Sequence, residues 1–516
     1  MMRITNGMMM NNCLNNINKN KLQMDKIYTQ IESQKLFQKP SEDPIAAIRS
    51  LRLRSTYTEI EQYLGKNVED AEAWMKITEA AMESLKTTVG GEEQSDGIVS
   101  YLNQGISEYQ TVSEREKIIS TLKAFRESIY QVGNEDNAGR TIFTGYRTDT
   151  TLTFMEDVSD RYKITENLTL DSFRNIKKVV DTHAGTGNYA ETDIVNADLH
   201  AVMLAYDGLD ATLSDGTAMT LSSTTNTALN GQAVTVRSLQ ANGNSVYTNI
   251  GDNDVIFIPE TGELIFGNGV YNDIDKNDMF SITYEKTGFR AGDLKPEHYF
   301  YCEKTTTTQS PGGAVSETTV YGRKKQINGV EYRYIEDQDI KYNINFNQNI
   351  KINVLAKDIL PPALGRDLDI IISSAEAAVD AHKRQESLEE QIEKAEEAGD
   401  TTTAEQLKYQ LKAAEMETAY AEDNLTKSFK KGLTLYQGHF SEITTQLADI
   451  GSRRARLELN KTRLESQLLT VKELKSVNED TNLEQAAVEY NNMQDVYDAS
   501  LKVAVQVVQK SLLEFI

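Results

Sequence analysis

The fold is decided by the C-terminal stretch Asn482–Ile516, which reads NLEQAAVEYNNMQDVYDASLKVAVQVVQKSLLEFI. Apolar side chains recur along it in steps of three and four residues, once Gln494 is allowed as a polar interruption, and this spacing is typical of a helix that packs against a partner helix. The stripe consists of Leu483, Ala487, Tyr490, Tyr497, Leu501, Ala504 and Val508. Chain ends are usually solvated, but the last apolar side chains of the stretch are Leu512, Leu513 and Phe515. We therefore expect the other end of the same chain, and then neighbouring subunits, to cover this stretch.

The N-terminal segment, residues 3–36, carries a matching stripe in which Lys21 fills the one gap. Its members are Met10, Leu14, Ile17, Met24, Tyr28 and Ile31. The segment is rich in asparagine, which is a weak helix former, so it should be marginally stable alone in water. Such stripes also occur in self-contained bundles. Because these two stripes lie at the extremities of the chain, we favour an assembly surface shared with other subunits.

The composition limits the classes of partner. The chain has 516 residues, a formal net charge of -24, 39% hydrophobic and 26% charged residues, which is enough for two to four globular domains. Acidic excess on this scale repels phosphate backbones and anionic lipids, so we expect no nucleic-acid and no membrane partner. The first twenty residues contain no continuous apolar run, and we therefore expect no cleaved signal peptide.

The placement of proline divides the chain. Residues 45–258 and 363–516 contain none, which leaves room for long helices. From Thr141 the hydrophobic period changes to two, as in Ile340, Tyr342 and Ile344, and predicts β-strands. The predicted fold class is α+β, with long N- and C-terminal helices that form a coiled-coil bundle around an inserted β-rich middle domain. We expect an N-terminal assembly arm (1–43), a first helical core half (44–150), a β-rich outer domain (151–354), a second helical core half (355–477) with an extra helical hairpin at about 385–430, and a C-terminal assembly helix (478–516).

Local signals predict individual elements. Asp43 before Pro44 should cap a helix that runs to about Val89. A second helix is expected over 98–132, and a β-hairpin over 255–266. Thr402 and Glu405 have the spacing of a capping box and should start the second helix of the extra hairpin.

The sequence predicts neither a catalytic nor a cofactor or metal site, so we expect no enzyme. The five histidines, at 183, 200, 298, 382 and 439, lie in unrelated segments, and Cys13 and Cys302 are far apart. Gly185–Gly187 lacks the strand-to-helix context of a phosphate loop. The Asp273, Asp275, Asn277 spacing lacks the closing glutamate of a calcium loop, which favours a plain solvated loop.

Five segments carry a resemblance to a known family. The segments are Met2–Thr5, Lys39–Ala47 (KPSEDPIAA), Gly139–Tyr146 (GRTIFTGY), Gly451–Arg453 followed by Leu457, and Ser511–Ile516 (SLLEFI). In this order they are similar to the hook-associated proteins of type 3, the hook–filament junction proteins within the flagellin family. The matches cover about the first 150 and last 75 residues.

The resemblance implies a structural component of the bacterial flagellum, an adaptor that joins hook to filament through ordering and coiled-coil packing of its terminal helices. It implies an extracellular location at the hook–filament junction, type III export without a cleaved signal peptide, and an export chaperone. The implied partners are further copies of the chain, the neighbouring hook-associated protein and flagellin. Filament flagellin is an alternative, although Ser41–Ala47 differs from the Ala-Asp-Asp-Ala-Ala-Gly segment of flagellins. A secreted coiled-coil adhesin or binding protein, with the middle domain holding a ligand, is an alternative from another class.

Overall fold

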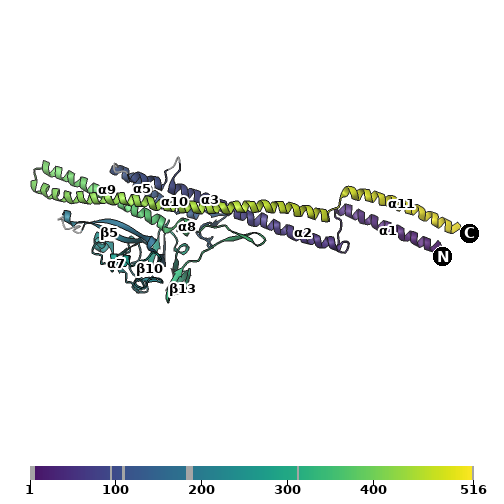
Figure 1. Ribbon diagram of the computed structural model, residues 1–516, viewed down its shortest axis with the longest axis horizontal. Coiled ribbons are helices and arrows are strands. Elements are labelled where there is room, and N and C mark those ends of the chain that lie inside the picture. The colour runs from purple at the N-terminus through teal and green to yellow at the C-terminus, as the bar shows by residue number, and fades with distance from the viewer. Residues whose placement is uncertain (1–5, 93–95, 107–110, 182–189, 311–312, 514–516) are drawn as a thin grey trace. The chain divides into compact units, whose positions relative to one another are not determined.

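The computed structural model describes residues 6–92, 96–106, 111–181, 190–310 and 313–513. Long helices at both ends of the chain flank a β-rich middle in the sequence, which confirms the predicted fold class (Figure 1). The chain forms two compact units, each assembled from distant parts of the sequence. The smaller unit comprises Met1–Asp70, Tyr342–Ile350 and Arg456–Ile516, and the larger comprises Ala71–Lys341 and Lys351–Ala455. The finer five-part division stays a prediction.

The smaller unit brings the two chain ends side by side. Helix α1 (Asn6–Ser33) packs along α11 (Leu483–Leu513). Helix α2 (Pro44–Gln62) lies against the last part of α10 (Thr401–Glu479), where the Lys475 ammonium sits 5.3 Å from the Tyr57 ring centroid. A small hairpin of β15 (Lys341–Asn345) and β16 (Gln348–Lys351) joins α10, because Asn460 Nδ2 donates to the Ile344 carbonyl at 2.8 Å.

The helix predicted to begin at Pro44 does so. Asp43 Oδ1 accepts a hydrogen bond from the Ala46 amide at 2.9 Å, and Pro44 occupies the first helical position, where its missing N–H costs nothing. The helical path continues through a π-helical segment (Tyr63–Val68) into α3 (Glu69–Gly90). The end of the helical path therefore agrees with the predicted end near Val89, and the π-helical segment is an addition that the hydrophobic spacing did not predict.

The single helix predicted over 98–132 is wrong, because the structure has two helices there. Helix α4 (Ile98–Gly105) ends early, and α5 (Val112–Ser128) starts anew before a 3₁₀ turn (Gln131–Asn134). The cause is a capping box: the Glu114 amide donates to Thr111 Oγ1 at 3.3 Å, and the Thr111 amide donates to Glu114 Oε2 at 2.8 Å. The Thr111-x-x-Glu114 pattern in the sequence is the signal that marks this helix start.

The larger unit contains the predicted helical hairpin, formed by α9 (Pro362–Glu397) and the first part of α10. Its turn uses Gly399 at φ +74°. The predicted cap at Thr402 is wrong, because Asp400 accepts the Thr403 amide at 3.1 Å on Oδ1 and also holds the Thr403 hydroxyl. A carboxylate at the first available position competes better for the free amides than the later threonine does. Helix α5 packs along α9.

Two five-stranded sheets form most of the β-rich part, with strand orders β12-β11-β3-β10-β6 and β4-β5-β9-β8-β7. The strands of the first are β3 (Val158–Leu168), β6 (Leu221–Ser223), β10 (Phe280–Phe289), β11 (Tyr301–Ser310) and β12 (Gly313–Tyr321). Those of the second are β4 (Phe173–Asp181), β5 (Ile194–Met203), β7 (Thr235–Val236), β8 (Val255–Ile258) and β9 (Glu263–Phe266). The pairing of β8 with β9 confirms the predicted hairpin.

Shorter elements complete the unit. Two-stranded pairs are formed by β1 (Asp136–Asn137) with β2 (Arg140–Thr141), and by β13 (Arg323–Ile327) with β14 (Val330–Tyr334). Short helices are α6 (Leu239–Asn242), α7 (Asn268–Asn272) and α8 (Ala356–Ile359). The segment Gly139–Tyr146 contains β2, and the Arg140 guanidinium lies 5.0 Å from the ring of the buried Trp74 on α3. This segment therefore anchors the entry to the β-rich part on the helices.

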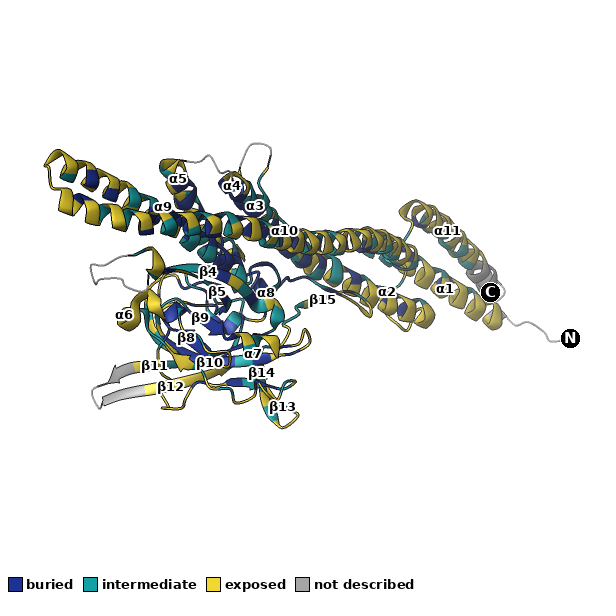
Figure 2. Ribbon diagram, turned by 60° about the vertical axis from the view of Figure 1, so that its left-hand side comes forward, coloured by how far each residue is buried: buried dark blue, intermediate teal, exposed yellow. Residues whose placement is uncertain are grey.

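The β-rich part has its own core (Figure 2). In the second sheet, Ile256, Ile258 and Ile265 are buried against Ile176 and Leu199, and the half-buried Ile370 of α9 packs on the same cluster. Near the first sheet, the Phe154 and Phe289 rings lie 4.9 Å apart, with Tyr162 and Tyr206 edge-on to Phe289. Tyr162 and Tyr206 are both buried and belong to this core.

Candidate assembly surface

The pairing of α1 with α11 buries few of the side chains in the two predicted stripes. The Tyr28 and Tyr490 rings lie 6.2 Å apart, and Asn20 Nδ2 donates to Ser500 Oγ at 3.0 Å across the pair. Among the described side chains of the seam, the buried apolar residues are Ile17, Ile27 and Ala486. Ile17 belongs to the predicted N-terminal stripe, Ala486 directly precedes Ala487 on the predicted apolar face of the C-terminal helix, and Ile27 lies outside the predicted stripe.

The other predicted residues fall into three groups. Half-buried are Met24, Ile31, Tyr490, Tyr497 and Ala504. Exposed are Met10, Leu14, Tyr28, Leu483, Ala487 and Leu501. Val508, Leu512, Leu513 and Phe515 lie outside the part of the chain whose side chains the structure describes. Their role in assembly stays a prediction.

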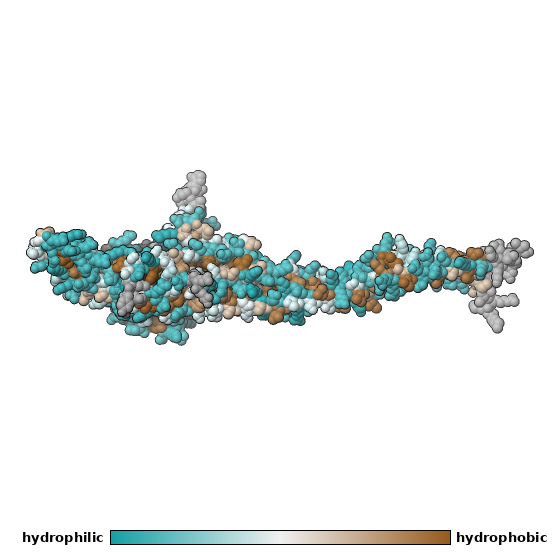
Figure 3. Space-filling view, turned by 90° about the horizontal axis from the view of Figure 1, so that it is seen from above, coloured by the Kyte–Doolittle hydropathy of each residue, from teal (hydrophilic) through white to brown (hydrophobic). Residues whose placement is uncertain are grey.

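Many apolar side chains of the smaller unit face solvent, and the exposed set is wider than the predicted stripes (Figure 3). Leu22 of α1 is 69% exposed, Ile45 of α2 is 77% exposed and Val477 of α10 is 74% exposed. Others are Met8, Met9, Leu36, Ile48, Leu51, Leu459, Leu469, Leu474, Val488, Val496, Val503 and Val505. Burial of one such side chain contributes about 1.5–3 kcal/mol. Exposed apolar surface is a feature of interaction sites where it forms a contiguous patch.

The ends of α1 and α10 are joined by a short β-bridge. The Leu36 amide donates to the Glu479 carbonyl at 2.8 Å, and the Thr481 amide donates to the Gln34 carbonyl at 3.0 Å. Gln34 adopts a left-handed conformation (φ 58°) at this point. The bridge fixes where α1 ends and α11 begins, so the terminal pair leaves α10 at a defined place.

The Glu479 carboxylate, 2% exposed, organises the polar contacts of this joint. Arg54 of α2 donates to it from Nε and Nη2, each at 2.8 Å, Ser50 donates from its hydroxyl, and the Lys35 ammonium lies 3.6 Å away. The hydrogen bonds from Arg54, followed by that from Ser50, lower the pKa of Glu479 to about 2. Sequence reasoning missed this site, because nothing in a single sequence links Glu479 to residues more than 400 positions away.

Three described histidines, which could in principle act in catalysis or metal binding, instead lie in structural contacts. His439 Nε2 lies 3.1 Å from Asp367 Oδ2, His382 contacts Glu422, and burial lowers the pKa of His298 to about 4. His183 and Gly185–Gly187 lie outside the described residues. Among the described residues, no group of three or more His, Cys, Asp or Glu side chains is arranged to hold a metal ion. In the loop weighed for calcium, Asp278 Oδ2 accepts the Asp275 amide at 2.9 Å and Asn226 Nδ2 at 2.8 Å.

The N-terminal helices of the chain match a known protein family. Residues 4–148 match the family described as the bacterial flagellin N-terminal helical region. This part of the chain is similar to the N-terminal helical region of bacterial flagellins. The matched residues include α1, the joint residues Ser50 and Arg54, and the Gly139–Tyr146 segment, and they end at the start of the β-rich part.

Several solved protein structures resemble this chain only distantly in sequence and fold. A protein described as a flagellar hook-associated protein from Vibrio parahaemolyticus is 11% identical, with a TM-score of 0.37, over 85% of this chain and 99% of that one. Hook-associated protein-3 from Legionella pneumophila is 9% identical, with a TM-score of 0.29, over 82% and 98%. The flagellar junction protein FlgL from Legionella pneumophila is 10% identical, with a TM-score of 0.28, over 84% and 100%. TM-scores of this size carry no argument about function. No curated protein sequence matches the chain.

The matched residues carry part of the exposed apolar surface. Helices α1 and α2 both lie within residues 4–148, and α1 is paired with α11. Within the described residues, no helix is long and apolar enough to cross a membrane.

Proposed function

We propose that this chain is a structural subunit of the bacterial flagellum, an adaptor between hook and filament, and not an enzyme. One observation carries the proposal. The flagellin N-terminal region supplies α1 and α2, whose apolar side chains remain exposed even though α1 is paired with α11. A helical tube requires contacts between copies that do not close on themselves. Terminal helix pairs with an uncovered apolar face supply such contacts.

Neighbouring subunits would complete the terminal pair. A two-helix pair alone buries one narrow seam, whereas packing in a tube would cover the remaining exposed leucines and valines. We expect the predicted interface residues, among them Met10, Leu14 and Leu501, to become buried at that stage. The partners are further copies of this chain, the neighbouring hook-associated protein and flagellin. We also propose type III export without a cleaved signal peptide, and an export chaperone.

The test uses cells that lack this chain. An adaptor predicts that such cells keep hooks but shed filament subunits into the medium, and that the full-length chain restores attached filaments. Loss of the filament subunit itself from both cells and medium would favour the alternative of a filament flagellin. Unchanged motility, together with tight ligand binding by the β-rich part, would favour a secreted adhesin or binding protein and would overturn the proposal.

A second test concerns order at the chain ends. In the isolated chain, amide hydrogen exchange in α1 should be fast, because few described side chains are buried between α1 and α11. The exchange should become slow on assembly. Slow exchange along the whole of α1 in the isolated chain would contradict ordering on assembly. Exchange in the buried strands β8 and β9 provides an internal reference, which should be slow in both states.

A further inference from the structure

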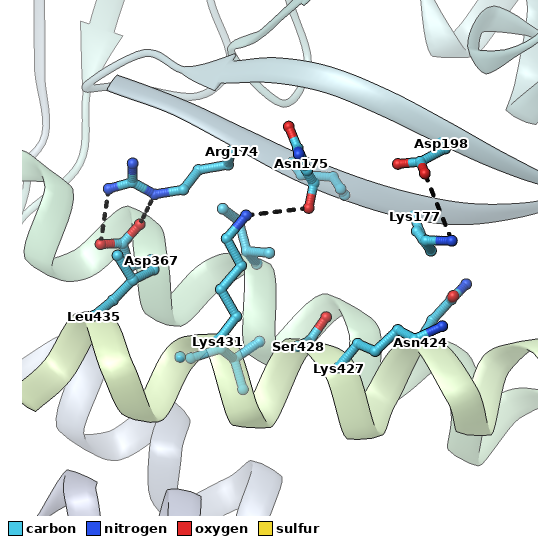
Figure 4. A pocket seen from close by; sticks show the side chains of 14 residues that line it. Arg174, Asn175, Lys177, Asp198, Asp367, Asn424, Lys427, Ser428, Lys431 and Leu435 are labelled. Carbon is cyan, nitrogen blue, oxygen red and sulfur yellow. Dashed lines mark hydrogen bonds and ion pairs between the residues drawn. The ribbon is translucent and has the colours of Figure 1, made fainter. Parts of the chain in front are cut away.

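A cavity of about 240 Å³ lies in the larger unit between the second sheet and the helical hairpin (Figure 4). One wall comes from β4 and β5, through Arg174, Lys177 and Asp198 among others, and the other wall comes from α9 and α10. The volume is somewhat below the ~300–1,000 Å³ typical of drug-sized ligands, so it admits only a small molecule. The cavity is distinct from the assembly surface, and its residues take no part in the proposed adaptor function.

Polar links on both sides hold the two walls in place. Arg174 donates to Asp367 from Nε at 2.7 Å and from Nη2 at 3.2 Å, and His439 contacts the same carboxylate. Elsewhere along α10, the Asn424 and Asn196 amides exchange hydrogen bonds of 3.0 Å and 3.3 Å. The walls are therefore joined by side chains from both the sheet and the helices, and the cavity is preformed.

The lining carries an excess of positive charge, although the chain as a whole is strongly acidic. It includes Arg174, Lys177, Lys427 and Lys431 against two carboxylates, those of Asp198 and Asp367. Arg174 and Asp367 neutralise each other, Lys177 lies 3.6 Å from Asp198, and Lys427 pairs with Asp423 outside the cavity at 2.5 Å. These pairings leave Lys431 as the lining cation without a carboxylate partner among the described residues.

The Lys431 ammonium has a single polar contact within the described part of the chain, a long hydrogen bond of 3.4 Å to the Asn175 carbonyl (Figure 4). Lys431 is exposed by surface area, but partial desolvation of its ammonium, followed by the nearby Arg174 charge, lowers its pKa, while the Asp367 and Asp198 carboxylates act in the opposite direction. An anion at this position would relieve both effects. Charge-assisted hydrogen bonds to such an ammonium are about twice as strong as neutral ones.

The remainder of the lining is apolar. Ile176 and Ile371 are buried, Ile370 and Leu435 are half-buried, and Gly432 presents no side chain. A Cβ at Gly432 would stand 2.3 Å from Ile371 Cδ1, so the Ile371 side chain would have to move to admit a larger residue there. An inorganic anion would leave this apolar surface uncovered, whereas a compact apolar body would cover it.

We propose that this cavity binds a small organic carboxylate, with its anionic head at Lys431 and its apolar body against Ile176, Ile371 and Leu435. Lys431 acts as the principal binding residue. Arg174 and Asp367 position the walls. The class is a short aliphatic or single-ring aromatic monocarboxylate, because the volume excludes larger molecules.

The test titrates the full chain with 4-methylbenzoate and with hexanoate, followed by ligand-observed NMR and calorimetry. The uncharged amide of each acid and inorganic phosphate serve as comparison probes. At least one carboxylate should bind at least tenfold more tightly than its amide and than phosphate. The proposal would be overturned if acid and amide bound with equal affinity, or if phosphate bound as tightly as the acids. It would also be overturned if neither acid bound at millimolar concentration.

Matched variants assign the site. Lys431→Met keeps the apolar stem and removes the charge, and it should weaken carboxylate binding at least tenfold. Lys430→Met, at an exposed neighbouring position that does not line the cavity, should bind as the unaltered chain does. Equal affinities of the two variants would overturn the assignment to Lys431. Circular dichroism of both variants checks that the helices remain folded.

Discussion

The Arg54 guanidinium of α2 holds the Glu479 carboxylate of α10 through two hydrogen bonds of 2.8 Å each. The same carboxylate accepts the Ser50 hydroxyl and lies beside Lys35, the residue that follows α1 after Gln34. One side chain therefore ties the end of α10 to α2 and to the exit of α1. Because α11 starts four residues later, the orientation of the terminal pair depends on this joint. The joint and the exposed apolar face together would decide whether neighbouring copies can pack.

The first prediction is a loss of stability in acid. The folded pKa of Glu479 is about 2 and its ordinary value is 4.5, so the carboxylate stabilises the fold above pH 4.5 and the contribution disappears as pH falls toward 2. The difference corresponds to about 3 kcal/mol. Thermal unfolding of the helices, followed by circular dichroism between pH 7 and pH 2, should show this decline. Glu479→Gln cannot ionise, so its thermal stability at pH 7 and at pH 2 should differ less than that of the unaltered chain. An unchanged pH dependence of stability in this variant would contradict the role of Glu479.

The second prediction concerns the partner of Glu479. Arg54→Ala leaves a buried carboxylate without its main donor, and it should destabilise the smaller unit by about 2–3 kcal/mol at pH 7. Arg52→Ala, on the exposed side of the same helix, should change the unfolding free energy by less than about 0.5 kcal/mol. Urea unfolding monitored by circular dichroism makes the comparison. Equal effects of the two substitutions would mean that the joint contributes nothing specific.

The third prediction tests a close approach of two helices. A Cβ at Gly105 of α4 would lie 2.0 Å from Phe429 Cε1 of α10, so Gly105→Ala should destabilise the larger unit by about 1–3 kcal/mol. Gly438 of α10 has no atom within 4 Å of its added Cβ, and Gly438→Ala should instead stabilise by about 0.5–1 kcal/mol through helix propensity. The opposite signs of the two thermal shifts are the measurement. Two shifts of the same sign would contradict the packing of α4 on α10.

The sequence predicted elements with a local signal better than contacts between distant residues. Ile450, Leu457 and Leu464 lie seven residues apart along α10 and are all buried, which is the spacing typical of a coiled-coil helix. The hairpin at Val255–Phe266 followed from its turn residues. The joint at Glu479 could not be predicted, because its members become neighbours only after the fold brings α2, α10 and the exit of α1 together. In the seam of α1 with α11, the buried Ile27 lies outside the predicted N-terminal stripe, since both helices have more apolar positions than one partner can cover.

The fourth prediction follows from the missed helix start at Thr111. Thr111→Ala removes the side chain that accepts the Glu114 amide, and it should cost about 1 kcal/mol. Thr111→Ser retains an acceptor at the same place and should be close to neutral. Thermal unfolding distinguishes the two variants. If both behave alike, the break between α4 and α5 does not depend on the capping box.

The fifth prediction separates folding from assembly. Leu22 of α1 is 69% exposed, so Leu22→Ser should change the unfolding free energy of the isolated chain by less than about 0.5 kcal/mol. In the assembled state, each copy would lose the free energy of burying this side chain, which is about 1.5–3 kcal/mol. Because the loss recurs at every subunit contact, few filaments should remain attached. Lys19→Ser, at an exposed polar position of the same helix, provides the matched control and should leave filament attachment unchanged. Electron microscopy of complemented cells counts attached filaments. Normal attachment with Leu22→Ser would remove this face of α1 from the assembly surface, while a loss of stability in the isolated chain would show that Leu22 already packs within the single subunit.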